Sequence, residues 1–235
     1  LQWTDIRKYN LQIFVSPRPN LWNIRQSHLS YSLEYITNHD NDLQYRTINL
    51  GLLNIFKNEA YLSLGFVNYY DNIPAPGFFL GPAFVPDGIY RYNVGSALFS
   101  SDHSRKFSGS LQVGGGTFYS GTFFGVRIEN YWKPTSKLRF DVNWAWNRLD
   151  LPNGEFTTSI LGARINYSFS PNLFTKAYIQ WNDFDKQIIS NILLRYIYSP
   201  GSDFYLVYNE ELDSVSGLQT SNRTLLAKLT YLLSF

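Results

Sequence analysis

Alternation of apolar and polar residues with a period of two runs through almost the whole chain. It limits the available folds more than any other feature. In the clearest segment, every second residue from Leu138 to Trp146 is apolar or aromatic, and the residues between them include Arg139, Asp141 and Asn143. Side chains of a β-strand point alternately to the two faces of a sheet. The pattern therefore predicts strands with one apolar face and one polar face.

The aromatic content indicates what the apolar face contacts. Phe, Tyr and Trp make up 18% of the 235 residues, and Tyr and Trp gather where an apolar phase meets water. The outward face of a soluble β-sandwich is seldom so aromatic. No run reaches the ~18 to 20 apolar residues of a membrane-spanning helix. Mean hydropathy is −0.22, as expected where lipid-facing and lumen-facing residues cancel. We therefore expect an all-β chain, an antiparallel transmembrane β-barrel with residues 1–235 as its C-terminal portion.

Thirteen strands are predicted, and most reach the ~9 to 11 residues that cross a bilayer at a tilt. They cover residues 7–16, 22–36, 43–56, 60–70, 88–100, 105–117, 122–132, 137–148, 156–169, 173–182, 187–198, 203–210 and 222–235.

The connections are expected to be asymmetric. Short Pro-bearing turns at 16–20, 133–136, 170–172 and 199–202 alternate with mostly longer polar loops, such as 71–87, 150–155 and 211–221. Outer-membrane barrels place short turns in the periplasm and long loops outside. Trp residues near both kinds of connection fit two aromatic girdles: Trp22 and Trp132 near short turns, and Trp144, Trp146 and Trp181 near loops.

Polar residues on the faces assigned to the lumen are the candidate functional site. They are Arg91, Asn93, Gln112, Arg127, Glu129, Arg139, Asp141, Asn143, Arg164, Asn166, Lys176, Gln180, Asn191, Arg195 and Lys228. One interpretation is a charge-selective pore or binding cavity, in which the excess of Arg and Lys predicts a weak anion preference. The alternative is a structural network in which Arg127 or Arg139 pairs with Glu129 or Asp141.

Catalytic and metal sites are not predicted. His39 and His103 fall in expected turns, whereas His28 shares a strand face with Ser30 and Ser32. A hydrolase would need a base within hydrogen-bond reach of its nucleophile, which this spacing does not establish. Acidic groups in expected loops fit either a divalent cation or simple solvation. They are Asp40 with Asp42, Asp183 with Asp185, and Glu210 with Glu211 and Asp213.

The segment from Asp71 to Pro82 differs from the other loops because it is long, rich in Pro and Gly, and partly apolar. We expect it to fold over or into the barrel as a constriction, or to contact a partner.

Several stretches resemble a known family. They are Thr4–Arg7, Ser16–Asn20, Arg105–Gly109, Phe156–Thr158, Asn191–Tyr196 and Ser199–Glu210. Together they resemble the C-terminal domain, of unassigned function, of bacterial outer-membrane proteins that carry an N-terminal module similar to carbohydrate-binding family 9. The resemblance implies a barrel that follows a glycan-binding-like module. It supplies no catalytic residues.

The expected function is that of a bacterial outer-membrane barrel acting as a channel or membrane anchor, linked to glycan binding or uptake. The alternatives are a barrel hydrolase acting on lipid or polysaccharide, and a structural subunit of a larger outer-membrane complex. Expected partners are outer-membrane lipid and lipopolysaccharide, with glycans or other outer-membrane proteins. A net charge of +2 gives no argument for nucleic acid, and a chain without Cys forms no disulfide. No cofactor motif is present.

The strand count also predicts an incomplete barrel. The final strand ends in the aromatic Phe235, which resembles the terminal assembly signal of outer-membrane barrels. Counting back from Phe235 at the short-turn side, the first of thirteen strands enters from outside, whereas single-chain barrels have an even number. We expect one or more strands before Leu1, giving fourteen or more, consistent with the lack of a signal peptide. A missed strand near 71–87 or 211–221 is the alternative.

Overall fold

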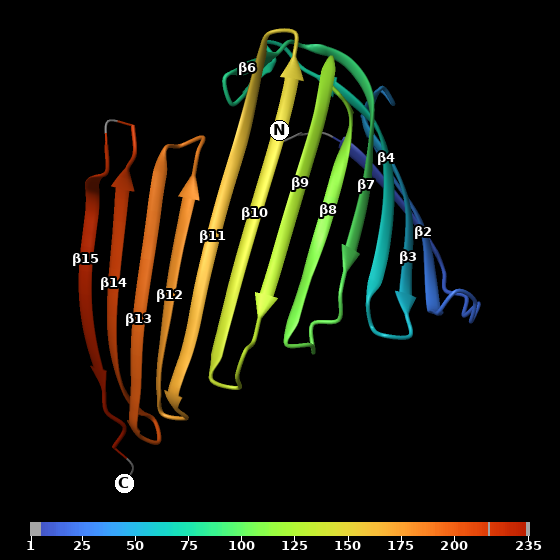
Figure 1. The fold of residues 1–235 in the computed structure, drawn as a ribbon. Coiled ribbons are helices and arrows are strands. Elements are labelled where there is room, and N and C mark those ends of the chain that lie inside the picture. The colour runs from blue at the N-terminus through green and yellow to red at the C-terminus, as the bar shows by residue number, and fades with distance from the viewer. Residues whose placement is uncertain (1–5, 216, 234–235) are drawn as a thin grey trace. The chain divides into compact units, whose positions relative to one another are not determined.

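A thirteen-stranded antiparallel sheet dominates the computed structural model, which describes residues 6–215 and 217–233 (Figure 1). Its strands, each paired with its neighbours in this order, are β1 (Ile6–Val15), β2 (Ile24–Asn38), β3 (Leu43–Phe56), β4 (Tyr61–Ile73), β7 (Gly88–Ser100), β8 (Phe107–Phe118), β9 (Gly121–Trp132), β10 (Leu138–Leu151), β11 (Gly154–Ser170), β12 (Leu173–Asn182), β13 (Gln187–Ser199), β14 (Ser202–Asp213) and β15 (Gln219–Thr230). The short strands β5 (Phe78–Leu80) and β6 (Ala83–Val85) form a separate hairpin. Within the described ranges, no helix has the length and apolar character needed to cross a membrane.

The structure confirms the all-β antiparallel prediction, and every predicted strand corresponds to one strand of the sheet. The β5–β6 hairpin lies where a missed strand was considered, but it does not join the main sheet. Around 211–221 the described residues hold only the end of β14 and the start of β15. Thr4, Asp5, and the relative positions of Leu1 and Phe235 lie outside the described residues.

The predicted asymmetry of the connections is largely wrong. The expected loop at 150–155 is a turn of only residues 152–153, because β10 and β11 both run further than predicted. β14 likewise extends to Asp213, so Glu210, Glu211 and Asp213 are strand residues and not loop residues. Polar residues at the strand ends suggested loops, but the backbone there continues its ladder of hydrogen bonds.

The chain divides into two compact units. Unit 1 comprises Leu1–Asp102, Ser110–Arg127 and Asn147–Thr157, and unit 2 comprises His103–Gly109, Ile128–Trp146 and Thr158–Phe235.

Unit 1 has an apolar face built from successive cross-strand rows. Pairing of β1, β2, β3, β4 and β7 places three apolar-rich rows side by side: Leu11, Leu33, Ile48, Asn68 and Asn93; then Ile13, Tyr31, Leu50, Phe66 and Gly95; then Val15, Leu29, Leu52, Leu64 and Ala97. Opposite-facing rows hold more small and polar residues, for example Gln12, Ser32 and Asn49, although that row continues with Val67 and Val94. The alternation of the sequence is therefore kept in register across five strands.

Unit 2 repeats this arrangement. On its apolar face, Ile165, Ala177, Ile192, Tyr208 and Leu225 form one row across β11 to β15. The neighbouring position of each strand, on the polar face, gives the row Arg164, Tyr178, Asn191, Asn209 and Thr224.

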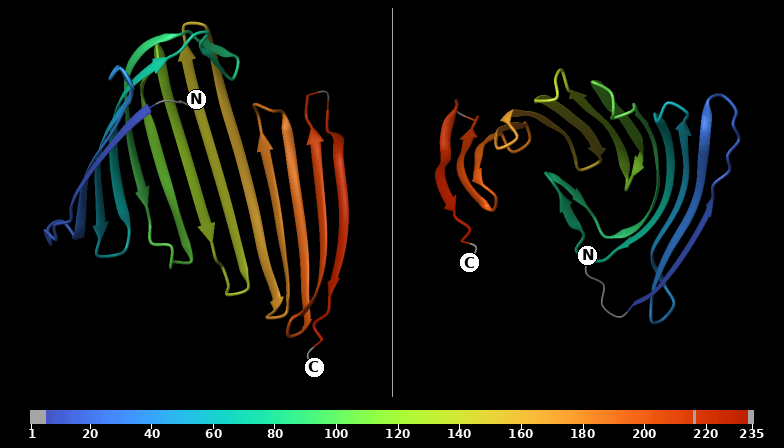
Figure 2. Two further views of the ribbon diagram at one scale, coloured as in Figure 1. Left: turned by 180° about the vertical axis from the view of Figure 1, so that it is seen from behind. Right: turned by 90° about the horizontal axis from the view of Figure 1, so that it is seen from below.

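The main buried cluster among the described residues lies beneath the β5–β6 hairpin and not inside a conventional core. Ala83, Val85 and Leu151 are buried there, and Tyr90, Tyr119 and Phe156 are among the rings that pack against them. Figure 2 (right) shows the hairpin lying over one face of unit 1, the polar face. The Pro- and Gly-rich segment thus folds over the sheet, as predicted, because its apolar side chains find cover there.

Candidate functional site

Most of the predicted site residues share one face. In unit 2, cross-strand register and side-chain contacts place eleven of them on the polar face: Glu129, Arg139, Asp141, Asn143, Arg164, Asn166, Lys176, Gln180, Asn191, Arg195 and Lys228. In unit 1, Gln112 lies opposite Leu98 on the polar face, and Arg127 follows Phe123 and Gly125 at two-residue spacing on that face.

The prediction is wrong for Arg91 and Asn93. Both lie on the apolar face of unit 1, in rows with Tyr70 and Asn68, while Tyr90 and Tyr92 point toward the hairpin. Polarity identified the wrong face because Arg91 lies beyond the apolar rows and Asn93 lies in the first of them, where the same face also carries polar side chains such as Asn68.

Two ion pairs cross the polar face of unit 2. Arg139 pairs with Asp141, one of the combinations that the structural interpretation allowed, although both residues lie on β10 and do not join two strands. Arg139 also lies over the Tyr131 ring with 5.0 Å to the centroid. The second pair joins Arg195 Nη2 to Asp203 Oδ2 at 2.7 Å, and Arg195 also lies over the Tyr205 ring at 4.9 Å. Asp203 was not among the predicted site residues because it sits beside a turn, although its position opposite Ile197 puts it near Arg195. Both pairs support the structural interpretation of part of the set.

Arg164 and Lys176 are neighbouring cations of the polar face of unit 2 that have no counter-charge in the described residues. Together with Asn166, Tyr178, Asn191 and Leu193 they line a concavity of about 310 Å³. Arg164 stacks over the Tyr178 ring at 5.0 Å, and Tyr178 Oη donates to Gln180 Oε1 at 2.6 Å. Within the described part of the chain, neither cation forms an ion pair with a carboxylate. The arrangement can therefore attract and transiently hold an anion.

The polar face as a whole is close to neutral. Besides the predicted acids, it carries Glu34 and Asp71 in unit 1 and Asp203 and Glu211 in unit 2. Lys8 pairs with Glu34 at 2.6 Å. These acids offset most of the predicted excess of Arg and Lys on the polar face. Any preference for anions therefore rests on cations that have no ion pair, such as Arg164 and Lys176 at the concavity.

The polar face of unit 1 carries a buried carboxylate beneath the hairpin. Asp71 is 6% exposed, and Tyr119 Oη donates to its Oδ2 at 3.3 Å. Burial, and to a lesser degree the Asp71 carboxylate, raises the pKa of Tyr119 to about 12. Tyr119 therefore remains a protonated donor at neutral pH.

The residues considered for hydrolysis do not converge as expected. His28 Nδ1 lies 2.8 Å from Ser16 Oγ, whereas no hydrogen bond joins it to Ser30 or Ser32 in the described residues. No carboxylate orients His28 in that part of the chain. The pair therefore lacks the third group that a Ser–His nucleophile requires.

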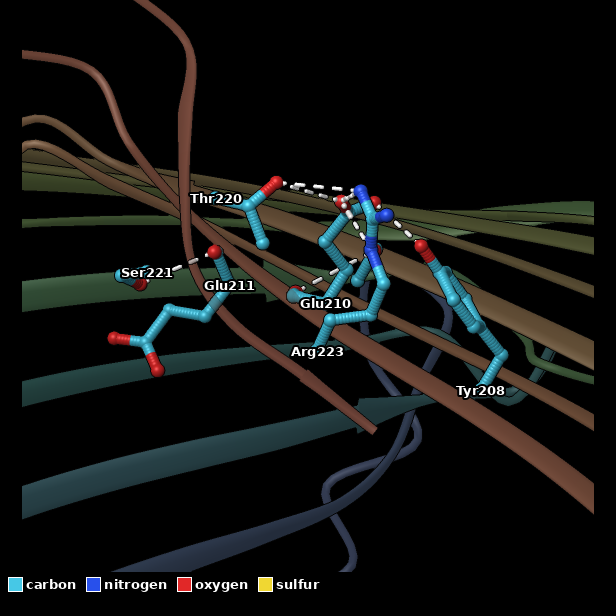
Figure 3. A network of polar contacts seen from close by, with 7 residues as sticks. Tyr208, Glu210, Glu211, Thr220, Ser221 and Arg223 are labelled. Carbon is cyan, nitrogen blue, oxygen red and sulfur yellow. Dashed lines mark hydrogen bonds and ion pairs between the residues drawn. The ribbon is translucent and has the colours of Figure 1, made fainter. Parts of the chain in front are cut away.

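Two of the acidic residues considered for a cation site, Asp183 and Glu210, have cationic partners, and Asp42 and Asp185 accept hydrogen bonds from amides. Lys186 Nζ lies 2.8 Å from Asp183 Oδ1, and Asp185 accepts from Asn182. On the apolar face of unit 2, Glu210 accepts from Arg223 and, at 2.9 Å, from Tyr208 (Figure 3). Thr220 Oγ1 donates to the same carboxylate at 3.2 Å. The charges of this network thus satisfy one another.

Comparison with known proteins adds no assignment: no protein-family model matches the chain, and no curated protein shows detectable sequence similarity to it.

Proposed function

We propose that this chain is the barrel of a bacterial outer-membrane protein and provides an anchor and a polar pathway across that membrane. The main observation in support of this proposal is the apolar face of unit 1. Its rows lie between the row of Tyr9, Tyr35, Arg46, Tyr70 and Arg91 and the row of Ser27, Asn54, Leu62 and Phe99. Tyr70 and Leu62 are eight residues apart on β4, about 26 Å along a strand. At the tilt of about 35 to 45° usual in transmembrane barrels, this length spans about 20 Å across the membrane, and the apolar Leu62 and Phe99 of the limiting row extend the surface toward the typical band of about 25 Å.

Exposure of large side chains supports the same proposal. On the apolar faces, Leu50 is 49% exposed, Phe66 43%, Val142 44% and Ile165 42%. Soluble proteins rarely leave contiguous apolar surfaces of this extent in water. Lipid would remove that surface from water, and the sheet satisfies its backbone groups between strands.

The polar pathway is proposed to prefer anions weakly. Arg164 and Lys176 face the concavity without carboxylate partners, whereas Arg139 and Arg195 are neutralised. The resemblance to barrels that follow a glycan-binding-like module supports an anchoring role for such a module. The proposal that the protein takes part in glycan binding or uptake is supported by that resemblance alone.

A pair of single-cysteine variants tests the membrane assignment, because the chain contains no native cysteine. Val142→Cys and Asn143→Cys are neighbours in β10 on opposite faces. In protein reconstituted into vesicles, an environment-sensitive label at Val142→Cys should report an apolar surrounding and be quenched by quenchers carried on lipid tails. Asn143→Cys should react with a charged maleimide. Equal reaction of both with the charged reagent would show that the apolar face is in water.

Planar-bilayer recording under a salt gradient tests the pathway. The wild type should show a reversal potential shifted toward anions. Absence of conductance in protein that passes the cysteine test would leave the anchor and reject the pathway.

A further inference from the structure

We propose that the rim of unit 1 beside the long 74–87 connection binds the phosphate groups of lipopolysaccharide, through a Tyr/Arg row formed by Tyr9, Tyr35, Arg46, Tyr70 and Arg91. This connection is the longest between neighbouring strands of the main sheet in the described residues, and outer-membrane barrels place their long loops outside. This inference rests on the proposed membrane location and names a lipid partner for that surface. The row crosses five adjacent strands, so its ends are about 19 Å apart.

The charges of this row are available. Arg46 Nη2 donates to Asn68 Oδ1 at 2.8 Å, and Asn68 Nδ2 donates to Asn93 Oδ1 at 2.8 Å. Arg91 is exposed and lies over the Tyr70 ring at 5.6 Å. Neither guanidinium forms an ion pair with a carboxylate within residues 6–215 and 217–233. By contrast, Arg25, Arg148 and Arg223 each have a Glu partner.

The two cations are spaced to share one anion. Tyr70 separates Arg46 from Arg91 in the row, which puts their backbones about 10 Å apart. The exposed guanidinium fork of Arg91 can bind phosphate in a bidentate manner. Arg46 is partly buried, with its Nε covered, so it contributes mainly its charge beside the Tyr70 ring. The neutral Asn68–Asn93 pair, directly beneath, offers amide groups and no competing negative charge.

The surroundings of the row favour a glycolipid over a free anion. Apolar rows begin immediately below it, with Leu11, Leu33 and Ile48, and would contact acyl chains. The rings of Tyr9, Tyr35 and Tyr70 provide flat, amphipathic surfaces suited to sugar rings at an interface. A ligand with phosphates on a sugar and acyl chains beneath matches all three features. Lipid A, the membrane-embedded part of lipopolysaccharide, has this chemistry.

The test compares Arg46→Gln/Arg91→Gln with Arg148→Gln. Arg148 lies at the loop end of β10 in unit 1, but it is already paired with Glu155 at 2.8 Å. Each protein, in neutral detergent, is titrated with bisphosphorylated lipid A and with the dephosphorylated glycolipid, and bound lipid is counted by native mass spectrometry. We expect the wild type and Arg148→Gln to prefer the phosphorylated form at least ten-fold. The double variant should lose that preference.

Three outcomes would overturn the inference: an unchanged preference in the double variant, equal binding of the dephosphorylated glycolipid, or equally tight binding of phosphatidylglycerol. Displacement of lipid A by inorganic phosphate alone would assign the site to free anions and also reject the lipid. The Val142→Cys and Asn143→Cys labelling test, repeated in the double variant, verifies membrane insertion. If labelling fails in the wild type, the membrane proposal itself fails. If labelling succeeds and removal of the phosphate groups of lipid A does not weaken its binding, only the lipid site fails.

Discussion

Unit 1 and unit 2 share the same alternation, but their polar faces are filled in different ways. In unit 1 the β5–β6 hairpin covers part of the polar face, and rings such as Tyr90 and Phe156 pack against Ala83 and Val85. In unit 2 the polar face carries ion pairs and the concavity at Arg164 and Lys176. The polar face of a sheet can thus be covered by an apolar segment, as in unit 1, or carry charged side chains that favour hydration, as in unit 2.

The largest expected effect follows from the buried cluster of unit 1. Leu151→Ala removes a side chain that is 5% exposed and packs with Ala83 and Val85. It should lower the free energy of unfolding by about 2 to 5 kcal/mol. Urea unfolding in vesicles measures the change, with Leu193→Ala on the polar face of unit 2 as the control. Equal losses in both would show that the hairpin cluster is not a core.

The apolar face of unit 2 gives an effect of similar or slightly smaller size. Val142→Arg, near the middle of β10, should cost about 2 to 4 kcal/mol, because a charge in lipid is poorly solvated. Asn143→Arg, one residue away on the polar face, should cost much less. The same unfolding assay compares the two. A tolerated Val142→Arg would contradict lipid contact on this face.

A smaller effect is expected where the hairpin region buries a carboxylate. Tyr119→Phe removes the donor to Asp71 and should cost about 1 to 3 kcal/mol, since a buried acceptor loses its partner. Tyr178→Phe in unit 2 loses a bond to the half-exposed Gln180 and should cost less. Identical costs would mean that burial beneath the hairpin does not matter.

The Tyr119 contribution should also depend on pH. Because the pKa of Tyr119 is raised from 10.0 to about 12, the folded state resists its deprotonation. Its stabilisation is complete below pH 10 and is lost as pH rises toward 12. The difference between wild type and Tyr119→Phe should therefore shrink over that interval. A difference that stays constant to pH 12 would refute the burial of this hydroxyl.

The smallest effect concerns ion preference. Arg164→Glu/Lys176→Glu should move the reversal potential of unit 2's pathway toward cations, because both side chains face the concavity. Arg223→Gln, on the apolar face, should leave the potential unchanged. A shift of equal size in Arg223→Gln would indicate that the assigned faces are wrong.

The strands and most of their faces were predictable because alternation is a local property. A residue such as Val142 or Asn143 reveals its face through its immediate neighbours, and cross-strand register preserves that face. The same reasoning failed for Arg91 and Asn93. Near this end of β7 the apolar face also carries polar side chains, so polarity no longer distinguishes the two faces.

The sequence by itself determined an all-β chain of thirteen long strands and the faces of most of their residues. It left open which of Arg127 and Arg139 pairs with Glu129 or Asp141, and whether the segment at 71–82 folds over the sheet or contacts a partner. Only the tertiary structure decided that this segment packs against Leu151 and Phe156, that Arg195 meets Asp203, and that Arg46 and Arg91 flank Tyr70. These contacts join residues on different strands. They depend on register and on the shape of packed side chains, and a period of two within each strand specifies neither.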